Sequence, residues 1–230
     1  MPVLYHHPVS AGSRFIRLAI GETGYDCDLQ EEPYWERRSE FIRHNPAGLP
    51  PVLVTENAYA ICGPMVIAEY LDETDGVLKR DRRLMPEQSY RRAETRRLIS
   101  WFLDKMDHDV TVPLVRERVL KPQMPITMGG GSPDSKILRA ARANIRQHMK
   151  YLSWLSGTRP WVAGDKFTYA DLAAAAAASV LDYLGEIEWA SYPHAKEWYQ
   201  RIKSRPAFRP LLSDRVRALP PVAHYADLDF

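Results

Sequence analysis

Two serines, Ser10 and Ser13, stand at the start of the first stretch of the chain with helically spaced apolar residues. A hydroxyl at a helix N-terminus can stabilise a neighbouring anion, because it donates a hydrogen bond where the helix dipole adds partial positive charge. Either serine is therefore a candidate anion-stabilising group. Ser13 also has a structural interpretation, which is favoured, because a serine directly before a helical run is typical of an N-cap.

Other reactive side chains lie nearby or stand alone. Tyr5, His6 and His7 have suitable chemistry, but their place at a strand end favours packing and hydration. The two cysteines, Cys27 and Cys62, lie outside any CxxC or zinc spacing, which fits a reducing cytosol without disulfides. A lone cysteine at a strand end, such as Cys62, is typical of a small buried apolar residue. We therefore expect neither a metal nor a cofactor.

The elements that must position these groups begin with an α/β pattern. Apolar runs at residues 3–5 and 25–29 predict strands on either side of a helix at residues 13–22, which Gly24 ends. A strand, helix and strand in so few residues predict a parallel pair. Residues 51–54 and 59–61 predict a hairpin, and Pro64 suits the first turn of a helix that runs to Leu71.

The second part of the chain has an almost entirely helical pattern. A polar, basic segment at residues 72–86 predicts a linker, so we expect domains at residues 1–78 and 87–212 and a tail at 213–230. Amphipathic runs at 87–120 and 135–155 flank a loop rich in proline and glycine, which predicts antiparallel helices. Thr168 and Asp171 have the spacing of a capping box and open an alanine run that predicts a core helix.

Composition narrows the function classes. The chain has 230 residues, 45% of them hydrophobic, which is enough for one or two domains with a sizeable core. Its formal net charge is +2, from 31 basic and 29 acidic residues, so no overall field favours nucleic acid or an anionic membrane. The N-terminus lacks the layout of a signal peptide, and no apolar run approaches the roughly 20 residues of a membrane span. The sequence predicts a cytoplasmic protein that binds neither nucleic acid nor membrane.

Four motifs occur in a characteristic order and spacing. They are Tyr5-His6-His7-Pro8 with Ser10 and Ser13-Arg14-Phe15-Ile16-Arg17-Leu18, then Asn45-Pro46-Ala47-Gly48-Leu49-Pro50-Pro51-Val52-Leu53, then Ile67-Ala68-Glu69-Tyr70-Leu71, and the box from Thr168 to Asp171. In these motifs the chain resembles the glutathione-transferase superfamily over nearly its whole length. The resemblance implies a thioredoxin-like α/β N-terminal domain and an all-α C-terminal domain.

The resemblance also implies where glutathione would bind. Ser10 or Ser13 would stabilise the glutathione thiolate, and Pro51, after a cis peptide bond, would present backbone groups to the cysteinyl amide. Related sequences grip the γ-glutamyl group with an acidic residue followed by serine, where this chain has Gly63-Pro64. Losing two charge-assisted contacts costs about 3 to 6 kcal/mol, a hundredfold or more in affinity. We therefore expect a degenerate glutathione site without catalytic residues; a transferase that uses Ser10 or Ser13 is the alternative.

Within the superfamily, the chain resembles a group of transferase-like cell-division factors of alphaproteobacteria. This resemblance implies binding to filaments of the tubulin-like GTPase FtsZ at mid-cell, with an effect on filament curvature and constriction. It also implies a homodimer formed through the first long helix, whose charged face includes Arg91-Arg92 and Arg96-Arg97. A dimer suits a filament partner, because two linked sites raise avidity along a polymer.

Two segments are predicted to meet the partner. Asp227, Leu228, Asp229 and Phe230 alternate acidic and apolar residues at the C-terminus, a layout that pairs an anchor side chain with electrostatic steering. A frayed tail is the alternative interpretation. Trp35 precedes a glutamate and two arginines, and an exposed aromatic there is typical of a binding hot spot, with packing of the indole as the equal alternative.

Overall fold

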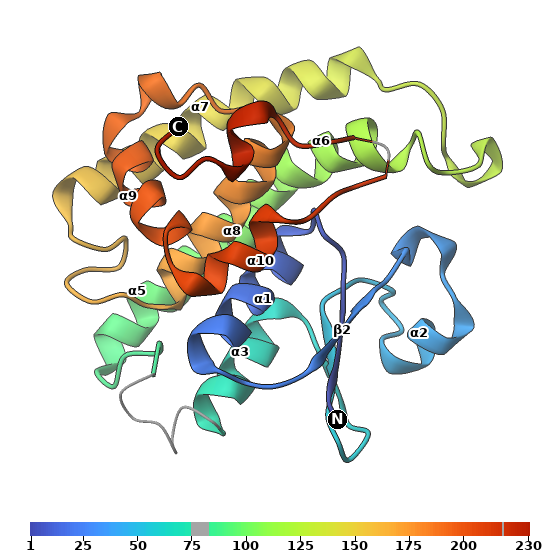
Figure 1. Cartoon of the computed structure of the whole chain (residues 1–230), viewed down its shortest axis with the longest axis horizontal. Helices are drawn as coiled ribbons and strands as arrows, with labels where there is room; N and C mark the ends of the chain where they lie inside the picture. The colour runs from blue at the N-terminus through green and yellow to red at the C-terminus, as the bar shows by residue number, and fades with distance from the viewer. Residues whose placement is uncertain (75–82, 218) are drawn as a thin grey trace.

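Four short strands form the mixed sheet of the first domain in the computed structural model, which describes residues 1–74, 83–217 and 219–230 (Figure 1). The strands lie in the order β2-β1-β3-β4. β1 and β2 are parallel, as predicted, whereas β1–β3 and β3–β4 are antiparallel. Their bounds are β1 Val3–His6, β2 Asp28–Glu31, β3 Val52–Val54 and β4 Ala60–Cys62.

Helices α1 (Ala11–Thr23), α2 (Ser39–His44) and α3 (Pro64–Glu73) complete this domain, together with a 3₁₀ turn at Tyr34–Glu36. Pro64 occupies the first turn of α3, and Gly24 ends α1 with a left-handed φ of 71°, both as predicted. α1 begins at Ala11, two residues before the predicted start. These elements confirm the thioredoxin-like α/β class.

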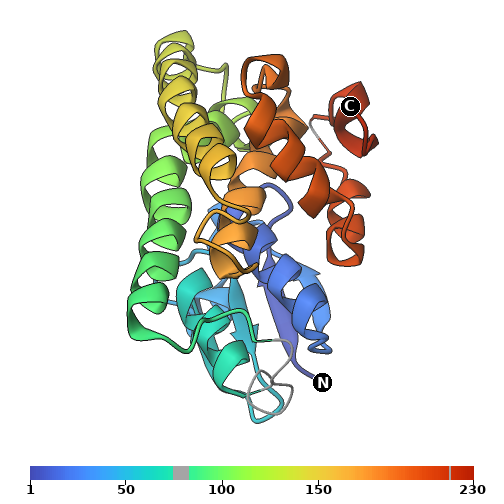
Figure 2. The same cartoon turned by 90° about the vertical axis from the view of Figure 1, so that its left-hand side faces the viewer.

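The second domain is helical. α5 (Ser89–Ser100) continues through π-helical turns and α6 (Val112–Val115) to Leu120. This long helical segment lies beside α7 (Ser135–Thr158), which runs in the opposite direction (Figure 2). The other helices in the part of this domain that the structure describes are α8 (Tyr169–Leu184), α9 (Pro193–Lys203) and α10 (Arg209–Leu212), with 3₁₀ turns at Ile126–Met128, Trp189–Ser191, Pro206–Phe208 and Ala223–Ala226. The antiparallel helices predicted from the two amphipathic runs are confirmed.

α8 joins the two domains. Its residues are buried throughout, the alanine run included, so that α1 packs directly against it. The ring of Phe15 in α1 meets that of Tyr169 edge to face, with the centroids 5.9 Å apart. The capping box of Thr168 and Asp171 is present. The alanine run is therefore a core helix, because small side chains allow the close approach of neighbouring elements.

The predicted linker falls partly outside the described residues. The position of residue 78 as the end of the first domain, and most of the basic run at 79–83, belong to the segment 75–82 that the structure does not describe. The ends of that segment are held together: Asp72 accepts hydrogen bonds from the Arg83 guanidinium at 2.9 Å and from the Met85 amide at 3.1 Å.

Candidate functional site

The N-terminus of α1 separates the roles of the two candidate serines. Ser10 is the N-cap, and its Oγ accepts a hydrogen bond from the Ser13 amide at 3.2 Å. Ser13 is fully buried, and its Oγ accepts instead from the His7 amide at 3.1 Å. The favoured interpretation of Ser13 as the N-cap was therefore wrong, because its hydroxyl accepts a hydrogen bond from a backbone amide of the turn that precedes the helix. Only Ser10 of the two lines the cleft between the domains.

The structure brings the other predicted site residues together beside α1. The Pro50–Pro51 peptide bond is cis, and the Gly63 amide donates to the Pro51 carbonyl at 3.1 Å. A Cβ on Gly12 would lie 3.3 Å from Pro64 Cγ and 3.4 Å from Pro51 Cδ, so both prolines border the start of α1. Gly63 has a φ of 93°, and the first turn of α3 carries neither an acidic residue nor a side-chain cap. The turn at Gly63 and Pro64, where a γ-glutamyl group would bind, therefore keeps its backbone path but carries no polar side chain.

The cleft next to Ser10 is small. Its volume is about 120 Å³, below the roughly 300 Å³ at which ligand pockets begin. Most of its wall is apolar, and the side chains that line it carry no positive charge; they are Val9, Ser10, Tyr34, Leu49, Pro50, Asp107, Thr111, Val112 and Val115. The only acidic group in this lining is Asp107, which the sequence did not single out, because nothing local distinguishes it from the neighbouring acidic residues of the same helix.

The electrostatics of the cleft oppose an anion. Burial raises the pKa of Asp107 to about 6, while the Thr111 hydroxyl donates a hydrogen bond to the carboxyl and partly offsets that rise. Asp107 is therefore mostly charged at pH 7. Burial lowers the pKa of both His6 and His7 to about 4, so neither imidazole supplies a positive charge. A thiolate in this cleft would meet a carboxylate rather than a cation.

Arg14 joins the first domain to the second and to the tail, a role that its motif did not reveal. It is fully buried, and its guanidinium donates to the Ser179 carbonyl and hydroxyl at 2.9 Å and to the Tyr225 hydroxyl at 2.8 Å. Asp214 lies 3.6 Å from the same guanidinium. No sequence signal marks these contacts, because the partners are up to 211 positions away.

The C-terminal tail is packed against the helical domain rather than frayed. The Phe230 ring lies 4.0 Å from Nζ of the fully buried Lys203, and it contacts Trp189 edge to face with centroids 5.4 Å apart. Asp227 and Asp229 are exposed, and Leu228 is 39% exposed. The predicted partner-binding residues therefore divide into an inward anchor, Phe230, and three outward side chains.

We expect Phe230→Ala to lower the free energy of unfolding by about 1 to 2 kcal/mol, because the half-buried ring leaves its aromatic and cationic neighbours. Hydrogen exchange should accelerate at residues 226–229, since the tail loses its anchor. Thermal unfolding and exchange followed by mass spectrometry test this expectation. Leu228→Ala is the control and should leave the exchange pattern unchanged; equal exchange in the Phe230 variant and the native chain would contradict the anchor role.

Trp35 is half-buried. Its ring meets His7 and Tyr34 edge to face, with centroids 5.6 and 5.7 Å apart, so part of the indole packs and part faces solvent. Figure 1 places the segment between β2 and α2 well apart from the C-terminus. The two predicted partner-binding segments therefore do not form one continuous surface.

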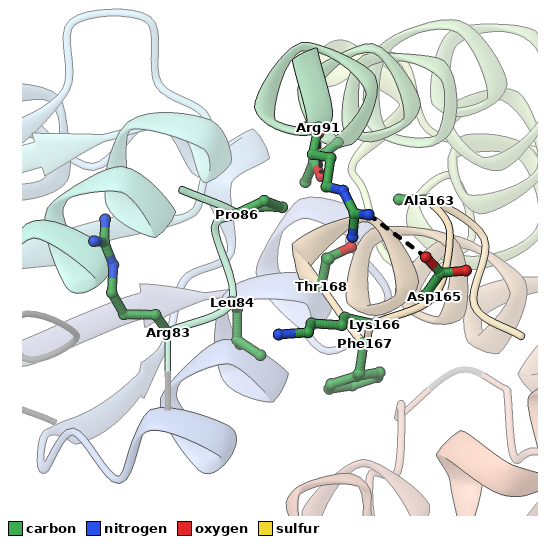
Figure 3. A pocket seen from close by; sticks show the side chains of 10 residues that line it. Arg83, Leu84, Pro86, Arg91, Ala163, Asp165, Lys166, Phe167 and Thr168 are labelled. Atoms are coloured by element: carbon green, nitrogen blue, oxygen red, sulfur yellow. Dashed lines mark hydrogen bonds and ion pairs between the residues drawn. The ribbon is translucent and has the colours of Figure 1, made fainter. Parts of the chain in front are cut away.

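A second hollow lies between the segment after Arg83 and the loop before α8 (Figure 3). Its volume is about 70 Å³, and an ion pair between Arg91 and Asp165, 3.5 Å apart, crosses it. It shares no lining residue with the cleft beside Ser10 and contains none of the predicted site residues.

The described ranges contain no three histidine, cysteine, aspartate or glutamate side chains that converge as a metal site requires. Each helix in these ranges is too short or too polar to cross a bilayer.

Comparison with known proteins agrees with this architecture. Residues 4–79 match the model of the glutathione S-transferase N-terminal domain, and residues 108–206 match that of the C-terminal domain. FtsZ-localized protein A of Caulobacter vibrioides is 41% identical, over 99% of this chain and 97% of that protein.

Two solved structures extend the likeness to three dimensions. A glutathione S-transferase from Sinorhizobium meliloti 1021 is 64% identical, with a TM-score of 0.98 and full coverage of both chains. FzlA from C. crescentus is 41% identical, with a TM-score of 0.90 over 100% of this chain and 99% of that one. From the motifs, the two-domain fold and these matches together, the chain belongs to the glutathione S-transferase family.

Proposed function

We propose that this chain is a non-catalytic, transferase-like regulator of cell division that binds FtsZ filaments at mid-cell and affects their curvature and constriction. The observation that carries the proposal is its 41% identity, over almost the whole chain, to a protein named for its localisation with FtsZ. The substitution of Gly63-Pro64 for the acidic residue and serine of related transferases supports the non-catalytic part.

Two features of the site support the proposed loss of transferase chemistry. At the start of α3 no carboxylate meets the glutathione ammonium, no hydroxyl meets its carboxylate, and Pro64 has no amide to donate. In the cleft, the Asp107 carboxylate disfavours the thiolate that the reaction needs. One feature weakens binding and the other weakens activation, so a change at one alone does not restore turnover.

The outward face of the tail is the proposed contact with the filament. Asp227 and Asp229 flank the exposed Leu228, and Phe230 holds this short segment on the helical domain. A preorganised segment binds with a smaller loss of conformational entropy than a flexible one. The anchored tail therefore presents a defined acidic and apolar surface, and Trp35 is proposed as a separate contact.

A homodimer through α3 and α5 would make the protein bivalent. Two large apolar side chains stand exposed on these helices, Val66 at 57% and Tyr90 at 65%. Arg96 of α5 and Glu69 of α3 form an ion pair at 2.7 Å, so the two helices present one surface. Pairing that surface across a two-fold axis would cover both apolar side chains and place two tails on one particle.

Two measurements test the proposed function. We expect no micromolar glutathione binding by isothermal titration calorimetry, and co-sedimentation of the chain with FtsZ polymerised by GTP. FtsZ kept unpolymerised with GDP is the control, in which the chain should remain in the supernatant. Micromolar glutathione affinity without co-sedimentation would refute the regulator and support the transferase.

Asp227→Lys should weaken co-sedimentation with FtsZ filaments about tenfold, because it reverses a charge on the exposed face of the tail. Because the Asp227 carboxylate accepts from the Asp229 amide at 3.0 Å and acts on the charge of the buried Lys203, thermal unfolding should be measured beside binding, and we expect it to remain cooperative. Glu197→Lys, an equal charge change at an exposed position of α9, is the matched control and should bind as the native chain does. Co-sedimentation by Asp227→Lys at the native level would remove the tail from the interface.

A transferase is the second candidate, favoured by the 64% identical structure that carries the name glutathione S-transferase. Ser10 lines the cleft, and its Oγ accepts a hydrogen bond from the Ser13 amide. Because Ser10 is the acceptor in that bond, its hydroxyl proton can still be donated to a thiolate. The apolar wall of the cleft suits a hydrophobic electrophile. A conjugation assay with such an electrophile, compared between the native chain and Ser10→Ala, separates this candidate from the regulator.

A further inference from the structure

β2 is an edge strand whose outer side is open. Within residues 1–74, 83–217 and 219–230 it pairs only with β1, and the Asp28 and Glu32 amides donate to the Pro2 and His6 carbonyls at 2.9 and 2.8 Å. Backbone groups alternate in direction along a strand, so the amides and carbonyls of Leu29 and Glu31 point away from β1. Such a row of unpaired groups is a template for another extended chain.

The side chains of β2 leave this edge accessible. Asp28, Leu29 and Glu31 are exposed, and the exposed fraction of Leu29 is 49%. The strand contains neither proline nor lysine, which commonly block the pairing of edges. Its carboxylates do oppose one partner, a second copy of the same strand, because like charges would then face each other across the pair. The edge therefore favours a partner with positive side chains.

An apolar hollow of about 390 Å³ lies on one side of this strand. Ile20 of α1 and Cys27 and Leu29 from the β2 segment form one wall, and Pro206, Ala207 and Pro210 of the helical domain face them. Arg17 also borders the hollow, but both terminal nitrogens of its guanidinium, Nη1 and Nη2, donate to Asp214 at 2.8 and 2.9 Å. The hollow is thus suited to an apolar side chain rather than to an anion.

A larger hollow adjoins this apolar hollow, because Tyr25 and Asp26 line both. It lies at one end of the sheet, between the residues just before β1 and the turn that joins β3 to β4, and adds the side chains of Tyr59, Tyr70 and Glu56. Aromatic faces next to carboxylates attract ammonium and guanidinium groups through cation–π and ionic contacts. The apolar hollow therefore adjoins a cation-binding environment at Tyr25 and Asp26.

We propose that the β2 edge with these two hollows is a docking site for an extended peptide segment of a partner protein, in which an apolar residue is flanked by lysine or arginine. The segment adds a fifth strand beside β2, where its backbone pairs with Leu29 and Glu31. Its apolar side chain enters the hollow at Cys27 and Leu29, and a basic side chain reaches Asp26. The span from residue 26 to residue 31 corresponds to about 20 Å of extended chain, or six to seven residues. This site goes beyond the proposed filament contact of the tail.

An acetylated heptapeptide that alternates lysine or arginine with valine is the probe. At saturation it should slow hydrogen exchange of the Leu29 and Glu31 amides at least tenfold in NMR spectra of the native chain. The same peptide, N-methylated on every residue, keeps its charge and side chains but has no amide to donate from either edge, and it should give no such protection. Equal effects of both peptides, or no protection at Leu29 and Glu31, would overturn the proposal.

Two variants sharpen the test. Leu29→Pro removes an outward amide and should weaken peptide binding, measured by fluorescence anisotropy, at least tenfold, whereas Leu29→Val keeps the amide and should bind within about twofold of the native chain. The double substitution Asp26→Lys, Asp28→Lys should also lose at least tenfold, and it leaves the backbone intact if the proline variant fails to fold. Native-level binding by the double variant would overturn the recognition of a basic segment.

Discussion

The double substitution Gly63→Glu, Pro64→Ser should raise the affinity for glutathione about a hundredfold, because it restores a carboxylate for the ligand ammonium and a hydroxyl and an amide for its carboxylate. Space is available, since a Cβ on Gly63 would meet no atom within 4 Å. The positive φ of 93° at Gly63 makes any side chain there cost about 1 to 2 kcal/mol of stability. Isothermal titration calorimetry measures the gain.

The matched control is Gly63→Gln, Pro64→Ser, which carries the same backbone strain and nearly the same volume without the negative charge. Its gain should be at least tenfold smaller than that of the glutamate variant. Conjugation activity should stay low in both, because Asp107 still opposes the thiolate in the cleft. Unchanged glutathione affinity in the glutamate variant would show that Gly63-Pro64 is not what weakens binding.

Asp171→Ala should lower the free energy of unfolding by about 3 to 5 kcal/mol, the largest effect that we expect on stability. The carboxylate of Asp171 is fully buried and accepts from the Val162 amide at 2.9 Å, the Trp198 indole at 3.2 Å and the Thr168 amide at 3.0 Å. Alanine removes the capping box and leaves these buried donors without partners. Urea unfolding followed by tryptophan fluorescence measures the loss.

Asp165→Ala is the control for that experiment. Asp165 lies in the same loop, but its side chain is 76% exposed and its ion pair with Arg91 is at the surface. Surface pairs of this kind contribute little, so the control should change stability by less than about 1 kcal/mol. A loss below about 1 kcal/mol in Asp171→Ala itself would contradict the role of this carboxylate as the hub of the loop before α8.

Much of the fold was predictable because its signals are local. The hairpin of β3 and β4, the proline at the start of α3, the glycine after α1 and the box of Thr168 and Asp171 each depend on residues a few positions apart. Ser10 and Ser13 show where local reasoning ends. Both serines fit the same N-cap pattern. Because of the path of the preceding turn, the His7 amide donates to Ser13, and Ser10 is the residue that caps the helix.

The sequence by itself determined the family scaffold and the absence of an acidic residue and serine at the start of α3, because each of these features depends on residues that are close together in the chain. Only the tertiary structure decided that Asp107 faces the cleft, that Arg14 holds the tail and that Phe230 turns inward over Lys203. Those contacts join residues far apart in sequence, and which side chains meet depends on how α1, α8 and the tail pack. The same packing leaves Ser10 at a cleft that carries a carboxylate, so the first candidate for chemistry lies in a site unsuited to a thiolate.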